Sequence, residues 1–287
     1  MSPRVGLLGV GRMGRPIAHA LVEAGYDLLA YDPVANRAAG FASAGSVGEV
    51  AESADVLVTV LPGTPELETA MTQAIAALRP GTLWLDLGSS DPRVAERIGH
   101  SIEHRVESVG APMGGGVEAV QTRTLQFFVG GPDDVVERAR PLLQVLGTID
   151  HVGTAVGAGY TAKLLANLLW FGQVVAVTEA LLLGQSLGLS PATLRRTLAA
   201  SAGGSVFIND YLDRLLDGDY LESFGIDRCV EELDALADLA RAEGVPFELS
   251  TLVARLHRDA LERFGAVDGE LLAAKLLEQR AGRDLRR

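Results

Sequence analysis

The chain has little cysteine, few aromatic residues and no excess of positive charge. Cys229 is the only cysteine in 287 residues, so no disulfide forms within the chain and no cysteine cluster can bind a metal ion. The formal net charge of −12 argues against nucleic acid or an anionic membrane surface as a partner, because both need a basic face. None of the five histidines has the spacing of a metal-ligand pair, so we expect no metal site.

The beginning of the chain lacks the pattern of a secretory leader, because residues 1–11 (MSPRVGLLGVG) enter a strand-like run almost at once. We therefore expect a reducing, cytoplasmic location. Apolar residues, by contrast, are plentiful at 48%, which is enough for a large core. The length suits one large domain or two ordinary ones.

A glycine-rich turn stands between the first strand-like run, residues 4–9, and a helical pattern over residues 16–24. It reads Gly9-Val10-Gly11-Arg12-Met13-Gly14, the spacing of a dinucleotide-binding turn. In such a turn the first glycine allows the tight bend, the second lets a pyrophosphate approach the backbone, and the third lets helix and strand pack closely. The helix N-terminus then offers amide donors to the phosphates. A glycine turn that only caps the helix is the structural alternative.

An acidic residue, Asp32, ends the second strand-like run (residues 27–31), 18 residues after Gly14. A carboxylate at this place accepts hydrogen bonds from the adenosine ribose and repels a 2′-phosphate, so NAD is favoured over NADP. Arg37 follows five residues later and keeps NADP possible.

Strand-like and helix-like segments continue to alternate up to about residue 150. The expected strands are 55–61, 82–87, 105–109 and 125–129, and the expected helices are 65–78, 92–98 and 135–146. This order predicts a doubly wound parallel sheet with its ligand at the carboxyl ends of the strands. The loops after Leu61 and Leu87 then lie on the binding edge. The glycine-rich loop 110–116 offers backbone amides to a carboxylate, or is an ordinary flexible turn.

The segment 157–184 is nearly continuously apolar and free of proline, which predicts a long buried helix. Four polar residues argue against a membrane span: Lys163, Asn167, Gln173 and Glu179. Lys163 and Asn167 lie four residues apart and so share one face of the helix. A lysine in such surroundings either has a function or extends its ammonium group to solvent at the helix start.

Helical patterns dominate the rest of the chain, so we expect a dinucleotide-binding domain over residues 1–156 and a helical domain over residues 157–287. A helix is expected to start at Pro191 behind Ser190, and others to span 226–244, 249–264 and 268–279. The basic end, residues 280–287, is expected to fray.

These motifs, in this order, resemble the β-hydroxyacid dehydrogenases, the family of 3-hydroxyisobutyrate dehydrogenase, tartronate semialdehyde reductase and 6-phosphogluconate dehydrogenase. The resemblance rests on five stretches of the chain: Gly9 to Gly14, Leu61-Pro62, Asp86 to Pro92, Gly110 to Gly116, and Gly157-Ala158-Gly159-Tyr160-Thr161-Ala162-Lys163-Leu164-Leu165-Ala166-Asn167. It implies an α/β Rossmann-like domain followed by an all-α domain that is joined to it by a long helix. It also implies assembly through the helical domains, as a homodimer or homotetramer.

The same resemblance implies hydride transfer between a nicotinamide cofactor and a small β-hydroxy acid or related alcohol. Lys163 would be the general acid or base, with Asn167 beside it on the helix. The implied cofactor-binding residues are Gly9, Gly11, Arg12, Met13, Gly14, Asp32, Leu61, Pro62 and Ser89. The implied substrate-binding residues are Gly114, Gly115, Gly116 and Trp170.

Several positions depart from the family pattern. Gly110 replaces an aspartate and Gly114 a serine in the substrate loop, Ala166 replaces an asparagine, and Glu231-Glu232 stands where the family has a second lysine. Cofactor and chemistry therefore carry over better than substrate identity. Two alternatives remain: an imine reductase-like enzyme and a non-catalytic dinucleotide-binding module. Both relatives usually lack the lysine, so Lys163 argues against them.

Overall fold

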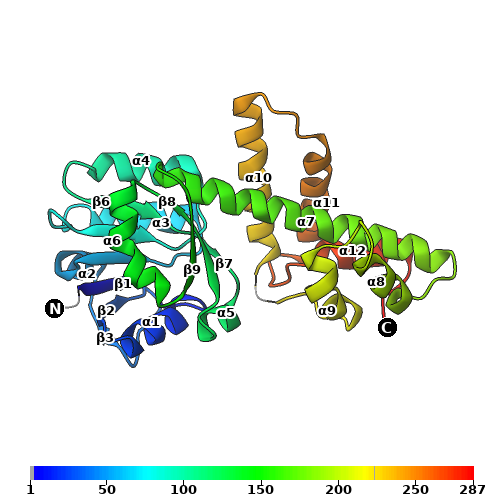
Figure 1. The fold of residues 1–287 in the computed structure, drawn as a ribbon, viewed down its shortest axis with the longest axis horizontal. Helices are drawn as coiled ribbons and strands as arrows, with labels where there is room; N and C mark the ends of the chain where they lie inside the picture. Colours follow the sequence, from blue (N-terminus) through cyan, green and yellow to red (C-terminus); the bar gives the residue numbers. More distant parts are fainter. Residues whose placement is uncertain (1–2, 223) are drawn as a thin grey trace. The chain divides into compact units, whose positions relative to one another are not determined.

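The computed structural model describes residues 3–222 and 224–287. The chain divides into two compact units, Met1–Lys163 and Leu164–Arg287. We call them the sheet unit and the helical unit (Figure 1).

The sheet unit is built on one sheet whose strands follow the order β3-β2-β1-β4-β5-β6-β8-β7, with β9 beside β8. Neighbouring strands are parallel from β3 to β6. β8 then runs antiparallel to both β6 and β7, and β9 pairs parallel to β8. The strands are β1 (Arg4–Leu8), β2 (Asp27–Tyr31), β3 (Ala42–Ser43), β4 (Val56–Thr59), β5 (Leu83–Asp86), β6 (Glu107–Gly110), β7 (Met113–Gly114), β8 (Leu125–Gly130) and β9 (Gly147–Gly153).

Helices cover both faces of this sheet. The apolar sides of α1 (Gly14–Glu23) and α6 (Asp133–Gln144) pack into one core. Those of α2 (Val47–Ser53), α3 (Thr64–Ala74) and α4 (Pro92–Ile102) pack into the other (Figure 1). A short helix, α5 (Val117–Gln121), follows β7. The predicted Rossmann-like architecture is confirmed, whereas the antiparallel pairing of β8 was not predicted.

The carboxyl ends of the central strands lie in register. Leu8 pairs with Thr59, Thr59 with Asp86, and Asp86 with Gly110. The strand order reverses between β1 and β4, and a ligand of a doubly wound sheet binds at this kind of switch point. The glycine turn follows β1 directly, so the predicted binding loops share one edge of the sheet.

The long helix α7 (Val156–Ser186) begins in the sheet unit and continues through the helical unit. The helices that follow are α8 (Pro191–Ala199), a π-helical turn (Phe207–Tyr211), α9 (Leu212–Leu216), α10 (Ile226–Glu243), α11 (Glu248–Phe264) and α12 (Leu272–Ala281). Ser190 caps α8 by accepting a hydrogen bond from the amide of Thr193, as predicted. Gly244 ends α10 in a left-handed conformation, with φ at +65°.

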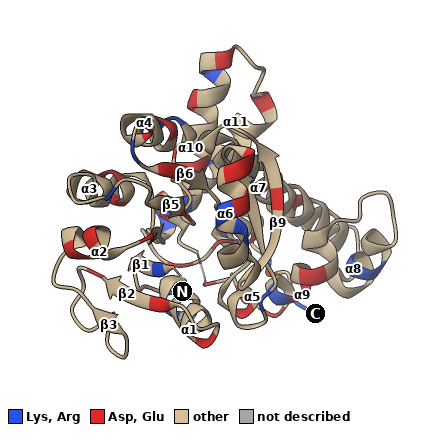
Figure 2. Ribbon diagram, turned by 60° about the vertical axis from the view of Figure 1, so that its left-hand side comes forward, with Lys and Arg blue, Asp and Glu red and all other residues tan. Residues whose placement is uncertain are grey.

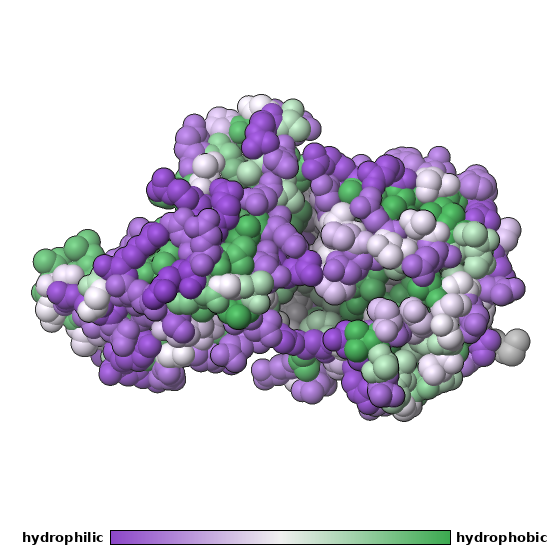
Figure 3. Space-filling view, turned by 180° about the vertical axis from the view of Figure 1, so that it is seen from behind, coloured by the Kyte–Doolittle hydropathy of each residue, from purple (hydrophilic) through white to green (hydrophobic). Residues whose placement is uncertain are grey.

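One side of α7 packs into the core of the helical unit through Phe171, Val174 and Leu181, all fully buried. By length and composition this helix could also cross a membrane, with a mean hydropathy of 1.5 over its most apolar stretch, but core helices pass the same test. Its other side carries a set of exposed leucines, Leu165, Leu169 and Leu183, and Leu187 just after the helix is exposed as well. Figure 3 shows hydrophobic residues at the surface of the helical unit.

The basic C-terminus does not fray as the sequence suggested. Leu285 is fully buried against the helical unit's core. The buried carboxylate of Glu278 accepts hydrogen bonds from the Leu285 amide (2.6 Å), the Arg286 guanidinium (3.0 Å) and the Tyr220 hydroxyl (2.6 Å). The buried Leu285 side chain and the buried Glu278 carboxylate therefore anchor the C-terminal segment, although its basic composition is typical of a frayed end.

Candidate active site

The glycine turn after β1 has the geometry that a dinucleotide needs. Gly9 has φ at +96°, and a Cβ there would lie 2.2 Å from the Val60 carbonyl oxygen. A Cβ at Gly14 would lie 2.0 Å from the carbonyl oxygen of Gly9, so only glycine allows this close packing. A Cβ at Gly11 would have an Arg37 guanidinium nitrogen as its nearest neighbour, at 3.9 Å, so space for a pyrophosphate remains beside the backbone. These residues fit a bound dinucleotide.

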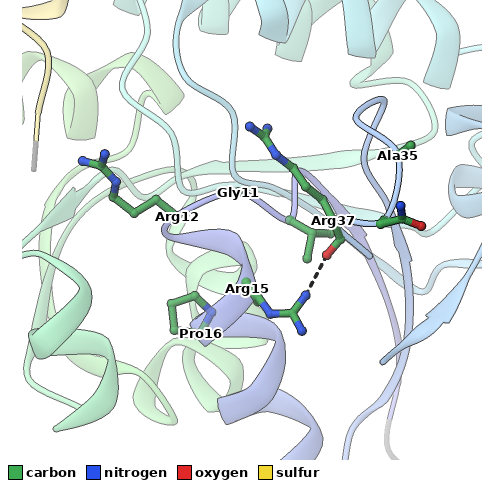
Figure 4. Close-up of a pocket in the computed structure, with 8 residues that line it drawn as sticks. Gly11, Arg12, Arg15, Pro16, Ala35 and Arg37 are labelled. Atoms are coloured by element: carbon green, nitrogen blue, oxygen red, sulfur yellow. Dashed lines mark hydrogen bonds between the residues drawn. The ribbon is translucent and has the colours of Figure 1, made fainter. Parts of the chain in front are cut away.

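A pocket of about 490 Å³ opens beside this turn. Three arginines line it: Arg12 from the glycine turn, Arg15 from the start of α1 and Arg37 from the loop after β2 (Figure 4). The Arg15 guanidinium donates a hydrogen bond of 2.9 Å to the carbonyl oxygen of Arg37. This basic lining stands out because the chain as a whole has a net charge of −12. Elsewhere Asp and Glu occur on many helices, with Lys and Arg between them (Figure 2). A phosphate-bearing ligand matches this pocket.

Asp32 connects the end of β2 to the glycine turn. Its carboxylate accepts hydrogen bonds from the amides of Val10 (2.8 Å) and Val34 (2.9 Å). Its side chain is 4% exposed, and the Arg37 guanidinium lies 3.7 Å from it. The sequence predicts that Asp32 accepts hydrogen bonds from a ribose. In the structure its bond to the Val10 amide also ties the glycine turn to the end of β2.

The loops after β4 and β5 carry the remaining predicted cofactor residues. Leu61 and Ser89 are partly exposed, and Pro62 is exposed. In the substrate loop Gly115 has φ at +105°, and a Cβ at Gly116 would meet no atom within 4 Å. Gly114 pairs with Gln126 of β8, so β-pairing holds one end of this loop.

Lys163 lies in the second turn of α7 and is partly exposed. The first turn of that helix lies directly on the sheet, since a Cβ at Gly159 would come 2.3 Å from the Phe128 carbonyl oxygen of β8. Gly159 of the Gly-x-Gly-x-x-x-Lys motif thus allows close contact between helix and sheet, four residues before the lysine, whereas a Cβ at Gly157 would meet the Glu96 side chain of α4 at 2.6 Å.

Asn167 and Trp170 belong to the helical unit. The Asn167 amide donates a hydrogen bond of 2.6 Å to a carboxylate oxygen of Glu232 on α10, and Glu232 is 8% exposed. The Trp170 ring stands edge-on to Phe207 (5.3 Å between ring centroids) and to Tyr211 (5.0 Å). Its indole nitrogen is buried without a hydrogen-bond partner in the described part of the chain. Trp170 therefore has the surroundings of a core residue.

Sequence reasoning missed a buried polar group at the edge of the sheet. Asp86, Thr59 and Tyr160 are joined by hydrogen bonds and are almost completely buried. Asp86 was noted only as the start of a loop motif, and Tyr160 stands at a position that the motif leaves open. Their link joins residues 74 positions apart, which no local pattern reveals. Among the described residues no group of three or more His, Cys, Asp or Glu could hold a metal ion.

Comparison with known protein families gives two consecutive matches that together span most of the chain. Residues 4–157 match the NAD binding domain of 6-phosphogluconate dehydrogenase. Residues 157–277 match the NAD-binding domain of NADP-dependent 3-hydroxyisobutyrate dehydrogenase. The chain belongs to the β-hydroxyacid dehydrogenase family. It is accordingly an NAD(P)-dependent dehydrogenase.

Individual relatives support this assignment over most of their length. A probable 3-hydroxyisobutyrate dehydrogenase of Mycobacterium tuberculosis is 36% identical over 208 residues, 69% of this chain and 70% of that protein. The 2-(hydroxymethyl)glutarate dehydrogenase of Eubacterium barkeri is 30% identical over 266 residues, 89% and 88% of the two chains. The human mitochondrial 3-hydroxyisobutyrate dehydrogenase is 31% identical over 270 residues, 88% and 80%.

Solved structures give the same result for the fold. The M. tuberculosis 3-hydroxyisobutyrate dehydrogenase determined with L-serine has a TM-score of 0.89 at 28% identity, covering 96% of this chain and 99% of that one. An imine reductase from Pseudomonas sp. shares the fold with a TM-score of 0.63 at 19% identity, covering 96% and 99%.

Proposed function

We propose that this dehydrogenase interconverts a small β-hydroxy acid, or a related alcohol, and its carbonyl form, with Lys163 as the general acid and base. The observation that carries the proposal is the placement of Lys163. It stands four residues after Gly159, where α7 contacts the sheet edge on which the glycine turn lies. When bound, a nicotinamide cofactor accepts or supplies the hydride.

The protein's own part is the movement of one proton. In oxidation a neutral Lys163 amine takes the proton of the substrate hydroxyl as the carbinol carbon gives up its hydride. In reduction the Lys163 ammonium returns that proton to the carbonyl oxygen. Asn167, one turn further along α7, orients the substrate or the lysine. The glycine turn, with Arg12 and Met13, holds the pyrophosphate, while Leu61, Pro62 and Ser89 line the nicotinamide side.

The substrate class is narrowed by Glu232. The side-chain NH₂ group of Asn167 already donates a hydrogen bond to this largely buried carboxylate, so that N–H does not donate to a substrate. A negative charge beside Asn167 repels a substrate carboxylate and attracts a hydroxyl or ammonium donor. The amides of Gly115 and Gly116 are the remaining place for an anionic group, with Gly114 shaping the loop. We therefore include alcohols without a carboxylate, and amino alcohols, in the proposed range.

Replacement of Lys163 tests the chemical role. The chain has only two lysines, so Lys275→Ala on α12 is a matched control. We expect Lys163→Ala to lower kcat at least about a hundredfold at unchanged NADH affinity, because general acid–base catalysis contributes about 10²–10⁴-fold. Turnover above a hundredth of the parent would exclude Lys163 as the acid–base group. A screen of hydroxy acids, amino alcohols and a cyclic imine identifies the substrate and tests the imine reductase alternative. Tight NADH binding without turnover of any of them would favour a non-catalytic module.

For the coenzyme we propose that NAD is preferred and NADP is accepted. The negative charge of Asp32 disfavours a 2′-phosphate, but the Arg37 guanidinium 3.7 Å away offsets it, and Arg15 adds a second positive charge to the pocket. Arg37→Ala should weaken NADPH binding about tenfold or more, because the loss of one charged contact costs about 1.4 kcal/mol of binding free energy. NADH binding should stay within about twofold of the parent. Equal losses for both coenzymes would show that Arg37 does not contact the 2′ position.

We also propose that a second copy of the chain covers the exposed face of α7, giving a homodimer or homotetramer. Leu169 is 67% exposed and Leu183 is 63% exposed on a helix whose opposite side packs into the core. Analytical ultracentrifugation at micromolar concentration should show an oligomer that Leu169→Glu weakens. Leu249→Glu, on the equally exposed Leu249 of α11, is the control (73% exposed). A monomeric parent protein would contradict the proposal.

A further inference from the structure

We propose that Tyr160 is a positioning residue whose hydrogen bond to the buried Asp86 fixes the first turn of α7 and so places Lys163. The inference rests on the proposed role of Lys163 and goes beyond it, because it concerns how the sheet controls the position of that side chain. Tyr160 and Lys163 are three residues apart, so they are neighbours on the helix surface.

The acceptor is a carboxylate with no solvent contact. Asp86, the last residue of β5, is 1% exposed. One of its oxygens accepts hydrogen bonds from the Thr59 hydroxyl (2.5 Å) and the Gly88 amide (3.3 Å), and the other accepts from the Tyr160 hydroxyl (2.6 Å). The Trp84 indole in turn donates to the Thr59 oxygen at 3.1 Å.

Within the described residues, every hydrogen-bond donor to the Asp86 carboxyl is a neutral group. Burial raises the pKa of the Asp86 carboxyl, and burial together with the adjacent Asp86 raises the pKa of the Tyr160 hydroxyl well above its ordinary value. A buried acid without a cationic partner is costly, and a well-packed apolar residue would be cheaper at this position. In this proposal the buried group determines an arrangement, which is the junction of α7 with the strand ends.

The tyrosine ring fits because the strand end beneath it is glycine. A Cβ at Gly110 would lie 2.3 Å from the Tyr160 Cε2 atom and 2.6 Å from the Val156 carbonyl oxygen. A Cβ at Gly130 would lie 2.4 Å from the Ala155 carbonyl oxygen. The start of α7 thus rests on bare backbone of β6 and β8, and the ring passes over Gly110 to reach Asp86 on the neighbouring strand.

Close backbone contact and the hydrogen bond control different movements of the helix. Glycine contacts limit how closely the first turn approaches the sheet. The Tyr160–Asp86 bond opposes rotation of that turn about the axis of α7, at a point one turn before Lys163. Losing it should misplace the lysine without closing the pocket beside Gly11. A small misplacement of a reacting group is enough to reduce turnover substantially.

Two substitutions at the same carboxylate separate positioning from stability. Tyr160→Phe removes the hydroxyl on α7, whereas Thr59→Val removes the other side-chain donor, which lies on β4. Both leave Asp86 short of one hydrogen bond, so both should lower the Tm. We expect Tyr160→Phe to lower kcat tenfold or more with NADH affinity within about twofold of the parent. Thr59→Val should change kcat by less than about threefold.

Amide hydrogen exchange gives a readout that does not depend on turnover. Residues 157–163 should exchange faster in Tyr160→Phe than in Thr59→Val at equal global stability. If the phenylalanine variant does not fold, Asp86→Asn and Asp86→Ala replace it. The asparagine oxygen still accepts from Tyr160, so this variant should regain most of the kcat that the alanine variant loses. Equal kcat losses in Tyr160→Phe and Thr59→Val, or no loss in either, would overturn the positioning role.

The outcome is distinguishable from failure of the proposed function. If Lys163→Ala keeps its turnover, the catalytic role of the lysine is wrong whatever Tyr160 does. If Lys163→Ala is inactive while Tyr160→Phe keeps both kcat and slow exchange at residues 157–163, the catalytic role stands and the positioning role is wrong.

Discussion

His257 should make the helical unit less stable in mild acid. Its ring on α11 is fully buried, and its Nδ1 lies 2.9 Å from the Val253 carbonyl oxygen. A carbonyl oxygen only accepts, so Nδ1 carries the proton and Nε2 is the unprotonated nitrogen. Nε2 is buried without a partner in the described part of the chain, so a second proton there would have no acceptor. Burial lowers the pKa of His257 from 6.5 to about 4.

The sign and size of the effect follow from this lowered pKa. Between pH 4 and 6.5 the unfolded chain binds a proton that the folded chain does not, so this contribution to stability is complete above pH 6.5 and falls as the pH decreases toward 4. One pKa unit corresponds to about 1.36 kcal/mol, so the full loss is about 3 kcal/mol, and about 2 kcal/mol of it occurs between pH 7 and pH 5.

Guanidinium denaturation at pH 7 and pH 5, followed by circular dichroism, measures this loss. Carboxylates also titrate in this range. We therefore compare the change in unfolding free energy between pH 7 and pH 5 in the parent with the same change in His257→Leu. In the difference, the pH-independent effect of the substitution cancels. We expect a difference of about 2 kcal/mol. His104→Leu, at an exposed histidine, is the control and should behave like the parent. An equal loss of stability in the parent and in His257→Leu would refute the reasoning.

Two further predictions concern packing. Gly159→Ala should lower the unfolding free energy by about 3 kcal/mol or more, because the added methyl group meets the backbone of β8. Gly48→Ala on α2 is the control in the same thermal unfolding experiment and should raise the unfolding free energy slightly, because the nearest atom to its methyl group is 3.9 Å away. A Gly159→Ala protein as stable as Gly48→Ala would contradict the contact between α7 and the sheet. Leu285→Ala should cost about 2–5 kcal/mol in urea unfolding, because the side chain is fully buried. A change below about 0.5 kcal/mol would mean that the C-terminus is loose in solution.

The sequence allowed good prediction wherever a local pattern carried the structure. The strand-like run 27–31 coincides with β2, and Pro92 starts α4 as expected. The short apolar runs and the glycine turn need only neighbouring residues to be recognised. β9 (Gly147–Gly153) was missed because alternate residues face solvent and its sequence is mostly polar. The expected start at Asp268 is four residues early, since Asp268 pairs with Gly225 in a β-bridge before α12 begins.

Within the site, the residues that sequence reasoning found are those defined by spacing. Gly9, Gly14 and Lys163 stand in motifs whose geometry is local, and the backbone contacts at both glycines explain why that spacing is required. Asp86 and Tyr160 depend on strand register and on the crossing of α7 over the sheet, which only the three-dimensional structure provides. The same holds for Glu232, whose bond to Asn167 joins two helices.

Gly110 departs from the family pattern, and the structure gives this departure a packing role. In the sequence, a glycine in place of the family's aspartate only removes a charge from the substrate loop. In the structure Gly110 is the space through which Tyr160 reaches Asp86, and a Cβ there would overlap the ring. The two positions are therefore one unit, and Gly110→Ala should reproduce the kcat loss of Tyr160→Phe by displacing the ring. A Gly110→Ala protein that loses stability but keeps its kcat would show that the ring needs this space only for packing.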